Sequence, residues 1–449
     1  MEHQRLYRIL ADRASQSGES VFGEHHLVAE GKKRAPIQRV AVLTEAFLPK
    51  VDGVSKTSYL TVRYLQQTGR EVLIFAPDTS VSEIHGSEVV PLPSFPLSMA
   101  PETRVAMPTP LIEQRLHAFK PDLIHLGSPA LMSMSGMIAA RDMQIPVVAN
   151  YQTDLPGYAS HYGVRFLEQP IRDWLRYLHN GCHVNLAPTR TVQKSLRRHG
   201  FHRVRMWGRG VNLKQFDPSH RTADMRQRLL NGRNPESLVC LYVGRLANEK
   251  QVGMLLELAS KRGIALTIVG DGAQRQELEA LFAGTGTHFT GYLVGDELAQ
   301  AYASADVFTF ASPNETFGQV IQEAFASGLP CIVSQHGSVS ELVQQGVTGF
   351  ICEQNPYSFA HAAELLRDNP QRRLSMSRAA RAIAEKHPWS TVMGQLEDHY
   401  QLAVKVNNRF KRIYRYTSYH RTARLRSWLA TLGLWMGNTL VRRLRPRPV

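Results

Sequence analysis

The stretch 306–330 limits what this chain can fold into more than any other part of it. Val307–Phe310 is a short apolar run of the kind found in buried strands. Turn-forming residues at 312–314 end that run, and apolar side chains at helical spacing, including Ile321 and Phe325, follow it. In an α/β sheet, a strand that leads through a turn into a helix presents its carboxyl end to a ligand. The stretch therefore indicates a binding site on an α/β sheet.

Two glutamates in this stretch, Glu315 in the turn and Glu323 on the predicted helix, are eight positions apart. Eight residues span about two helical turns at ~3.6 residues per turn, so both carboxylates can face the same side. Gly318 lies between them, near the predicted helix start, where free backbone N–H groups favour an anion. A surface helix with two solvated glutamates would show the same spacing, and the residues around the pair decide between the two interpretations.

The rest of the chain alternates between strand-like and helix-like segments. In the first half, the predicted strands lie at 39–47, 71–76, 121–126, 146–154 and 183–189. In the second half, strands are predicted within 237–251, 265–272, 287–293, 330–343 and 346–352, with a helix at 252–262 after the first of them. Strands that alternate with helical patterns favour parallel sheets. The sequence therefore predicts an α/β fold of two Rossmann-like domains that face each other across a cleft, with ligands at the strand carboxyl ends.

The residues around the two glutamates read Pro-x-Glu-x-Phe-Gly and then Glu-Ala-x-Ala-x-Gly-x-Pro. This pattern resembles the E-x7-E signature of family 4 of the retaining glycosyltransferases, which have the two-domain GT-B fold. The resemblance covers residues 37–400, and it points to bacterial sulfoquinovosyldiacylglycerol synthases and to glycolipid mannosyltransferases. It implies that Glu315, a catalytic candidate, contacts the donor hexose and that Glu323 holds the nucleotide ribose. Phe317 and Gly318 belong to the same donor-binding motif.

The resemblance also assigns residues in four other loops to the donor. Arg245 and Lys250 look like the family's pair of cations at the donor diphosphate, and both are catalytic candidates. Gly53 would let the loop after the first strand approach the diphosphate. Gly270 stands in a segment similar to the family's Gly-Asp-Gly-Pro loop, and Tyr292 stands in the segment whose backbone contacts the base. A solvent-exposed Arg and Lys, and glycines that serve only turns, are the alternative interpretations.

The predicted strand at 146–154 ends in the polar residues Asn-Tyr-Gln-Thr-Asp. Gln152 stands where histidine is common in sulfoquinovosyl transferases and phosphatidylinositol mannosyltransferases. Glutamine does not titrate, so acid–base work at this position is excluded, but its amide can still bond to a sugar hydroxyl or a phosphate. Gln152 and Asp154 therefore join the catalytic candidates, and the departure from histidine leaves the identity of the donor open.

No cofactor and no metal are expected. Four cysteines, at positions 182, 240, 331 and 352, are widely spaced without a Cys-x-x-Cys pair, which argues against a zinc site or a disulfide framework. No Asp-x-Asp pair stands in a plausible strand-end loop. The nucleotide sugar is expected as a substrate, and protein cations rather than a metal would neutralise the departing diphosphate.

These features divide the chain into five predicted segments. In chain order they are a polar N-terminal arm at 1–36 with a short helix at 4–14, a Rossmann-like acceptor domain at 37–213, a Rossmann-like nucleotide-sugar domain at 214–386, a helix at 387–404 that returns to the first domain, and a basic amphipathic tail at 405–449.

The tail carries most of the net charge of the chain. Residues 405–449 contain twelve Lys or Arg and no Asp or Glu, against a formal net charge of +15 for the whole sequence. Its apolar run at 427–441, which contains Trp428 and Trp435, is too short to span a membrane but suits an interfacial helix on anionic lipid. A basic tail without a partner and an RNA-binding tail are alternatives. No nucleic-acid-binding module accompanies the tail, so no nucleic-acid partner is expected.

The sequence contains no apolar run typical of a signal peptide or a spanning helix, so the expected location is the cytoplasm, peripheral on the inner face of the plasma membrane. The predicted function is the retaining transfer of a hexose from a UDP- or GDP-linked sugar to a lipid acceptor such as diacylglycerol or glycosyl-diacylglycerol. A transferase with a soluble or polysaccharide acceptor, a GT-B sugar-nucleotide epimerase and a nucleotide-sugar-binding regulator are the alternatives.

Overall fold

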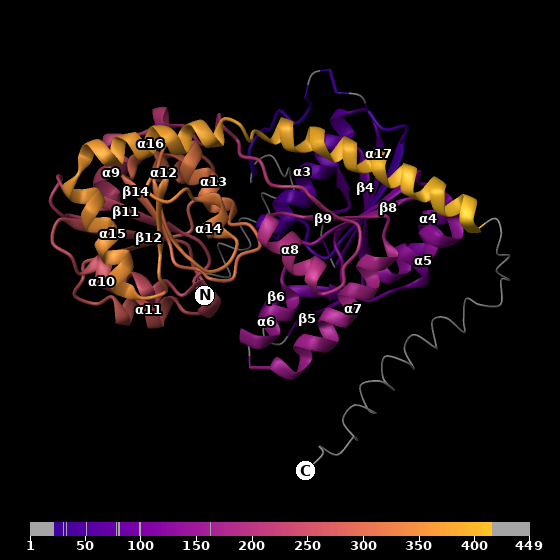
Figure 1. The fold of residues 1–449 in the computed structure, drawn as a ribbon, viewed down its shortest axis with the longest axis horizontal. Coiled ribbons are helices and arrows are strands. Elements are labelled where there is room, and N and C mark those ends of the chain that lie inside the picture. The colour runs from indigo at the N-terminus through magenta and orange to yellow at the C-terminus, as the bar shows by residue number, and fades with distance from the viewer. Residues whose placement is uncertain are drawn as a thin grey trace, which may run out of the picture.

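The structure, a computed structural model, describes residues 22–414 with the exception of residues 30, 33, 51, 78, 80, 98, 99 and 162. The helix predicted at 4–14 and the tail from residue 415 onward lie outside the described residues. Figure 1 shows two lobes side by side, each with a central sheet. One long helix, α17 (Trp389–Tyr414), leaves the second domain and lies along the first.

The first domain is built on an eight-stranded sheet with the order β10-β9-β8-β7-β1-β2-β4-β3. Neighbouring strands are parallel except for β3 and β4, which pair antiparallel. Every residue of β1 after Arg39 is buried, because helices cover both faces of the sheet. The elements are β1 (Arg39–Thr44), α3 (Gly53–Gln67), β2 (Glu71–Pro77), β3 (Glu83–Ile84), β4 (Ser87–Leu92), β5 (Ser94–Leu97), β6 (Ala100–Ala106), α4 (Pro110–Phe119), β7 (Leu123–Ser128), α5 (Ser133–Met143), β8 (Val147–Asn150), α6 (Leu155–His161), α7 (Glu168–Gly181), β9 (Val184–Ala187), α8 (Arg190–Arg198) and β10 (Val204–Met206).

The second domain contains a six-stranded, fully parallel sheet with the order β13-β12-β11-β14-β15-β16. Its central strand β11 is buried along its whole length. The elements are α9 (Ala223–Leu230), β11 (Leu238–Val243), α10 (Leu256–Ala259), β12 (Ile264–Val269), α11 (Arg275–Leu281), β13 (His288–Gly291), α12 (Gly295–Ser304), β14 (Val307–Phe310), α13 (Gln319–Ala326), β15 (Cys331–Ser334), α14 (Val339–Leu342), β16 (Gly349–Cys352), α15 (Pro356–Asp368) and α16 (Pro370–Ala384). The helix predicted at 252–262 is wrong in form, since a 3-10 turn at Val252–Leu255 precedes the single turn of α10.

The N-terminal arm is not separate from the first domain. Phe22 and Leu27 are buried in the core that the first sheet shares with α3 and α17. The side chain of Asn212 also donates to the carbonyl oxygen of Glu24 at 2.9 Å. Packing of the first domain therefore begins before residue 37, and the prediction missed it because isolated apolar residues in a polar segment create no periodic pattern.

The helix boundary predicted at residue 404 is also wrong. Helix α17 continues without interruption to Tyr414. Beyond 404, the Asn407 side chain donates to the carbonyl oxygen of Gln144 at 2.9 Å, and the Phe410 ring lies 5.6 Å from that of His183. These contacts hold the basic end of α17 on the first domain, although the sequence assigned its residues to the basic tail.

The chain passes between the domains twice, and the two crossings lie against each other. The N–H of Val211 donates to the carbonyl oxygen of His387 at 3.0 Å. A Cβ on Gly210 would lie only 2.6 Å from the Cα of Trp389, so glycine permits this close approach. The two covalent connections between the domains therefore lie side by side.

Candidate functional site

The loops predicted to converge at one end of the second sheet do meet there. The N–H of Gly270 donates to the carbonyl oxygen of Gly291 at 2.8 Å, which joins the loops after β12 and β13. The hydroxyl of Ser312 donates to the carbonyl oxygen of Glu249 at 3.3 Å, which joins the loops after β14 and β11. All four loops follow parallel strands, so they lie at the carboxyl edge of the sheet.

Glu315 and Lys250 form an ion pair at this edge. The Lys250 ammonium donates to Oε1 of Glu315, and the two side chains are 15% and 16% exposed. Burial alone would lower the pKa of Lys250, but Glu315, Tyr158 and Tyr242 raise it, and its net pKa lies above the ordinary value. Lys250 therefore remains a cation at neutral pH despite its burial.

Arg245 adds a second cation to the same loop and pairs with the buried carboxylate of Glu249. Tyr158, on α6 of the first domain, reaches this cluster of charges. Burial raises the pKa of Tyr158 to about 12, while Lys250 lowers it and Glu315 raises it. The charged cluster of the second domain thus has a phenol of the first domain beside it.

Glu323 is paired differently from Glu315. Its Oε1 lies 3.0 Å from the ammonium of Lys56 on α3 of the first domain, and its Oε2 accepts the hydroxyl of Tyr302 at 3.3 Å. As predicted, Glu315 lies in the turn and Glu323 on the helix, since α13 begins at Gln319. The loop, rather than a two-turn helix, determines where the first carboxylate points.

Gln152 lies where the two domains meet, and its amide is held at both ends. Its Nε2 donates to the carbonyl oxygen of Gly127, and its Oε1 accepts a bond from Arg209 at 3.1 Å. The backbone oxygen of Gln152 accepts the hydroxyl of Thr316 at 2.7 Å, which ties it to the residue after Glu315. The structure therefore brings Gln152 beside the motif of the second domain, as a residue with a fixed orientation.

Arg209 is a buried cation that the sequence analysis did not single out. Its side chain also donates to the carbonyl oxygens of Trp207 and Gly208, at 3.2 and 3.0 Å. Burial lowers its pKa to about 9. In the described part of the chain no carboxylate forms a salt bridge with it. A buried cation usually has a counter-charge that neutralises it. Because Arg209 has no such carboxylate partner among the described residues, its guanidinium adds positive potential beside Gln152.

Comparison with known proteins identifies the family to which this chain belongs. A model described as Glycosyltransferase Family 4 matches residues 51–215, and one described as Glycosyl transferases group 1 matches residues 226–383. A GDP-mannose-dependent alpha-mannosyltransferase of Mycobacterium tuberculosis (strain CDC 1551 / Oshkosh) is 38% identical over 374 residues, which cover 81% of this chain and 96% of that protein. The chain belongs to glycosyltransferase family 4.

Two further similarities agree with this family 4 glycosyltransferase assignment. The sulfoquinovosyl transferase SQD2 of Arabidopsis thaliana is 32% identical over 380 residues, 82% of this chain and 74% of that protein. The solved structure of Anabaena Alr3699/HepE in complex with UDP has a TM-score of 0.66 at 20% identity and covers 81% of this chain and 99% of that one. The predicted GT-B fold and the predicted enzyme class, a glycosyltransferase that uses a nucleotide sugar, are confirmed.

Three glycines that were assigned to the donor in this glycosyltransferase differ in their surroundings. A Cβ on Gly270 would lie 1.9 Å from the carbonyl oxygen of Gly244, and one on Gly318 would lie 2.8 Å from Cγ1 of Val339. Packing within the second domain already requires these two glycines. Around a Cβ on Gly53, by contrast, no described atom would lie within 4 Å, apart from its chain neighbours and the backbone of its own helix. Open space therefore lies beside the first turn of α3.

The remaining assigned residues of the glycosyltransferase occupy the margin of the site. Asp154 is exposed, accepts the hydroxyl of Tyr151 at 3.0 Å, and precedes α6, which carries Tyr158. Tyr292 is 37% exposed in the loop after β13, and Phe317 is buried beside Gly318. Their roles toward a donor stay predictions.

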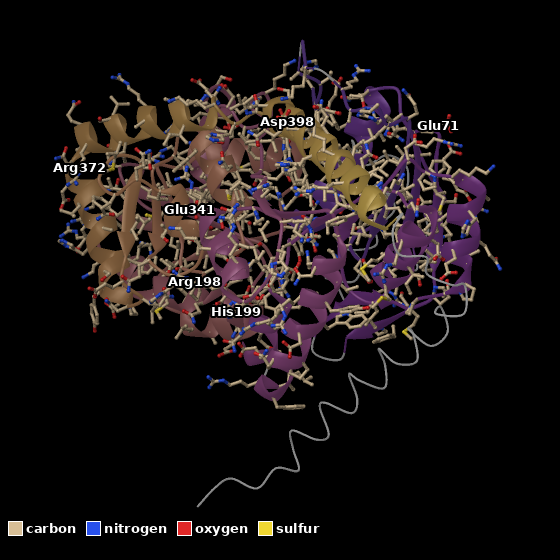
Figure 2. All side chains as sticks on the ribbon, turned by 45° about the vertical axis from the view of Figure 1, so that its right-hand side comes forward. Glu71, Arg198, His199, Glu341, Arg372 and Asp398 are labelled. Carbon is tan, nitrogen blue, oxygen red and sulfur yellow. The ribbon has the colours of Figure 1, made fainter. Side chains whose placement is uncertain are left out.

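The two domains of the glycosyltransferase also meet through residues that carried no sequence signal. The hydroxyl of Thr189 donates to that of Ser338 at 2.9 Å. Glu341, which is labelled in Figure 2, accepts the N–H groups of Arg190 and Thr191 at the start of α8, at 2.9 and 2.8 Å. Like Lys56 and Arg209, these residues have partners far away in the sequence, so no local pattern marks them.

The described residues contain no group of His, Cys, Asp or Glu side chains arranged to hold a metal ion. All four cysteines are buried and form no disulfide. Within the same residues, no helix has both the length and the apolar character needed to cross a membrane.

Proposed function

We propose that this enzyme transfers a hexose from a UDP- or GDP-linked donor, with retention of anomeric configuration, to a lipid acceptor such as diacylglycerol or glycosyl-diacylglycerol. The supporting observation is the meeting of Glu315, Lys250 and Arg245 at the strand ends of the second domain with Gln152 of the first. This arrangement gathers cations, a carboxylate and an amide where the two domains meet, which suits a charged donor and a separate acceptor.

The proposed chemistry uses these groups to hold the diphosphate as it departs. Breaking the bond between the anomeric carbon and the phosphate oxygen leaves negative charge on the diphosphate, which Arg245 and Lys250 stabilise. Glu315 contacts the hexose and orients Lys250 through their ion pair. Because Gln152 does not titrate, the proton of the acceptor hydroxyl is assigned to the departing diphosphate on the same face of the sugar.

The lipid acceptor and the membrane location rest on the sequence. The regions that resemble sulfoquinovosyldiacylglycerol synthases and glycolipid mannosyltransferases both point to lipid acceptors. The basic residues of 405–449 suit an anionic surface, at about 1 kcal/mol per contacting cation. We therefore place the enzyme on the inner face of the plasma membrane, attached peripherally.

A panel of UDP- and GDP-sugars tested against diacylglycerol and glycosyl-diacylglycerol in micelles examines this proposal. We expect one donor to give a glycolipid product with the anomeric configuration of the donor, which is read from the anomeric proton signal. Glu315→Gln should lower the rate by about 100-fold or more, as expected for loss of a charged group at the reacting centre.

The matched control is Glu71→Gln, which removes an exposed carboxylate from the start of β2 and should leave the rate unchanged. Transfer to a soluble sugar without lipid would favour the soluble-acceptor alternative. Conversion of the donor sugar in the absence of any acceptor would favour the epimerase. Full activity of Glu315→Gln would refute the assigned site.

A further inference from the structure

The two glutamates of the family motif have lysine partners from different domains. Glu315 pairs with Lys250 of its own domain, whereas Glu323 pairs with Lys56 of the first domain at 3.0 Å. The Lys56 and Glu323 side chains are only 13% and 9% exposed. The hydroxyl of Tyr302 bonds to the second oxygen of Glu323. Both oxygens of this carboxylate are therefore already engaged by protein groups.

Helix α3 does not need a cation at Lys56. The residue lies in the first turns of the helix, where the helix dipole favours negative rather than positive charge. Asp52 caps this end, since its carboxylate accepts the N–H groups of Val54 and Ser55 at 3.0 and 2.8 Å. The position of the Lys56 ammonium is therefore explained by its partner in the second domain, Glu323.

Space for an anionic group lies on the same side of the helix. Gly53 is three residues before Lys56, and residues at this spacing are neighbours on a helix surface. Apart from its two chain neighbours and the backbone of its own helix, no described atom would lie within 4 Å of a Cβ on Gly53. A phosphate beside Gly53 would therefore lie within reach of the ammonium of Lys56.

We infer that Lys56 is a specificity residue for the donor: it competes with the ribose for Glu323, and it pairs with the donor phosphates when the ribose takes that carboxylate. This inference rests on the proposed function and on the family resemblance, which assigns Glu323 to the ribose. A nucleoside displaces Lys56 and leaves its charge without a partner. A nucleoside diphosphate displaces it and supplies a new counter-charge. Lys56 thereby selects phosphorylated ligands over bare nucleosides.

Calorimetric titration of four ligands, uridine, UDP, guanosine and GDP, tests the inference on the full chain. In Lys56→Met, the nucleoside of the base that the enzyme uses should bind about fivefold more tightly, because its competitor for Glu323 is gone. Its diphosphate should bind about fivefold more weakly, because a phosphate partner is gone. Lys56→Arg keeps the charge and should preserve the preference for the diphosphate.

Glu341→Gln is the matched control. It weakens another contact between the domains, at the start of α8, without touching Glu323. The ratio of nucleoside to diphosphate affinity should stay at the wild-type value, which separates competition for Glu323 from general loosening of the two domains.

Two results would overturn the inference, and they are distinguishable. If wild-type protein binds the diphosphate but Lys56→Met leaves the affinity ratio unchanged, or weakens nucleoside binding, Lys56 does not compete with the ribose and the proposed function stands. If none of the four ligands binds to the wild type, the assignment of Glu323 to the ribose fails, and the inference fails with it.

Discussion

Glu45 directly follows β1 at the carboxyl edge of the first sheet, and its carboxylate joins two other segments. Oε2 accepts the N–H of Ala106 at the end of β6 at 2.9 Å, and Oε1 accepts that of Met132 just before α5 at 3.3 Å. Burial raises the pKa of Glu45 from 4.5 to about 7, although these hydrogen bonds act in the opposite direction. The carboxyl group of Glu45 therefore titrates near neutral pH.

This shift predicts a pH-dependent stability. Because the pKa of Glu45 is raised by folding, its contribution is complete below pH 4.5 and is lost as the pH rises to about 7. The free energy of unfolding should fall by at most ~1.4 kcal/mol per pH unit within this window. Measured by thermal unfolding, the wild type should lose more stability than Glu45→Gln over this range. Parallel pH profiles for the two proteins would contradict the assignment.

Among the helices, α17 depends on a buried ion pair for its position on the first domain. Glu397 of α17 binds Arg70 through both carboxylate oxygens, at 2.7 and 3.0 Å, and also accepts the hydroxyl of Tyr64 at 2.7 Å. The side chains of Arg70 and Glu397 are 2% and 0% exposed. This network joins α17 to α3 and to the start of β2, so it links the last helix to the first elements of the fold.

Removal of one member of this ion pair should lower the stability of the protein markedly. Glu397→Gln leaves the charge of Arg70 buried without a counter-charge, and we expect a loss of about 3–5 kcal/mol in the free energy of unfolding measured with urea. The double substitution Arg70→Met with Glu397→Leu should recover much of that loss.

Asp398 is the matched control on the same helix. Asp398, which is labelled in Figure 2, forms a salt bridge with Lys32, and the two side chains are 57% and 35% exposed. Asp398→Asn should change stability by only about 0–1 kcal/mol. Equal costs for Glu397→Gln and Asp398→Asn would show that the buried pair does not anchor α17.

At the scale of the whole molecule, the site exists only where the two domains touch. Thr316 of the second domain bonds to the backbone of Gln152 in the first, and Lys56 of the first pairs with Glu323 of the second. The two crossings of the chain at Val211 and His387 are the covalent connection. Neither domain alone carries the complete set of groups that the proposed transfer uses.

The role of the tail also concerns the whole molecule. Helix α17 indicates which truncations of the chain test that role. A chain that ends at residue 414 keeps the described length of α17 (Trp389–Tyr414) and should fold with unchanged stability while losing flotation with anionic vesicles. A chain that ends at 404 also loses the contacts of Asn407 and Phe410 with the first domain and should be less stable. Unchanged flotation of the 414 variant would refute the role of the tail, and zwitterionic vesicles are the control.

The order of strands and helices was predictable because it depends on local patterns. Buried parallel strands such as β1 and β11 are continuous apolar runs, and helices interrupt them at regular intervals. The segment 83–119 received no prediction, since its strands are short or contain proline, and β5 and β6 form a separate two-stranded sheet.

The sequence by itself determined the family, the two α/β domains and the motif that contains Glu315 and Glu323, because these depend on residue type and on short spacings. Only the tertiary structure decided which groups meet. Lys56 and Glu323 are 267 residues apart, and Gln152 and Thr316 are 164 residues apart. Such pairs form only when two separately folded sheets come together, and no periodicity along the chain records that approach. The motif therefore determines which residues carry the carboxylates, and the packing of the two domains determines which groups those carboxylates contact.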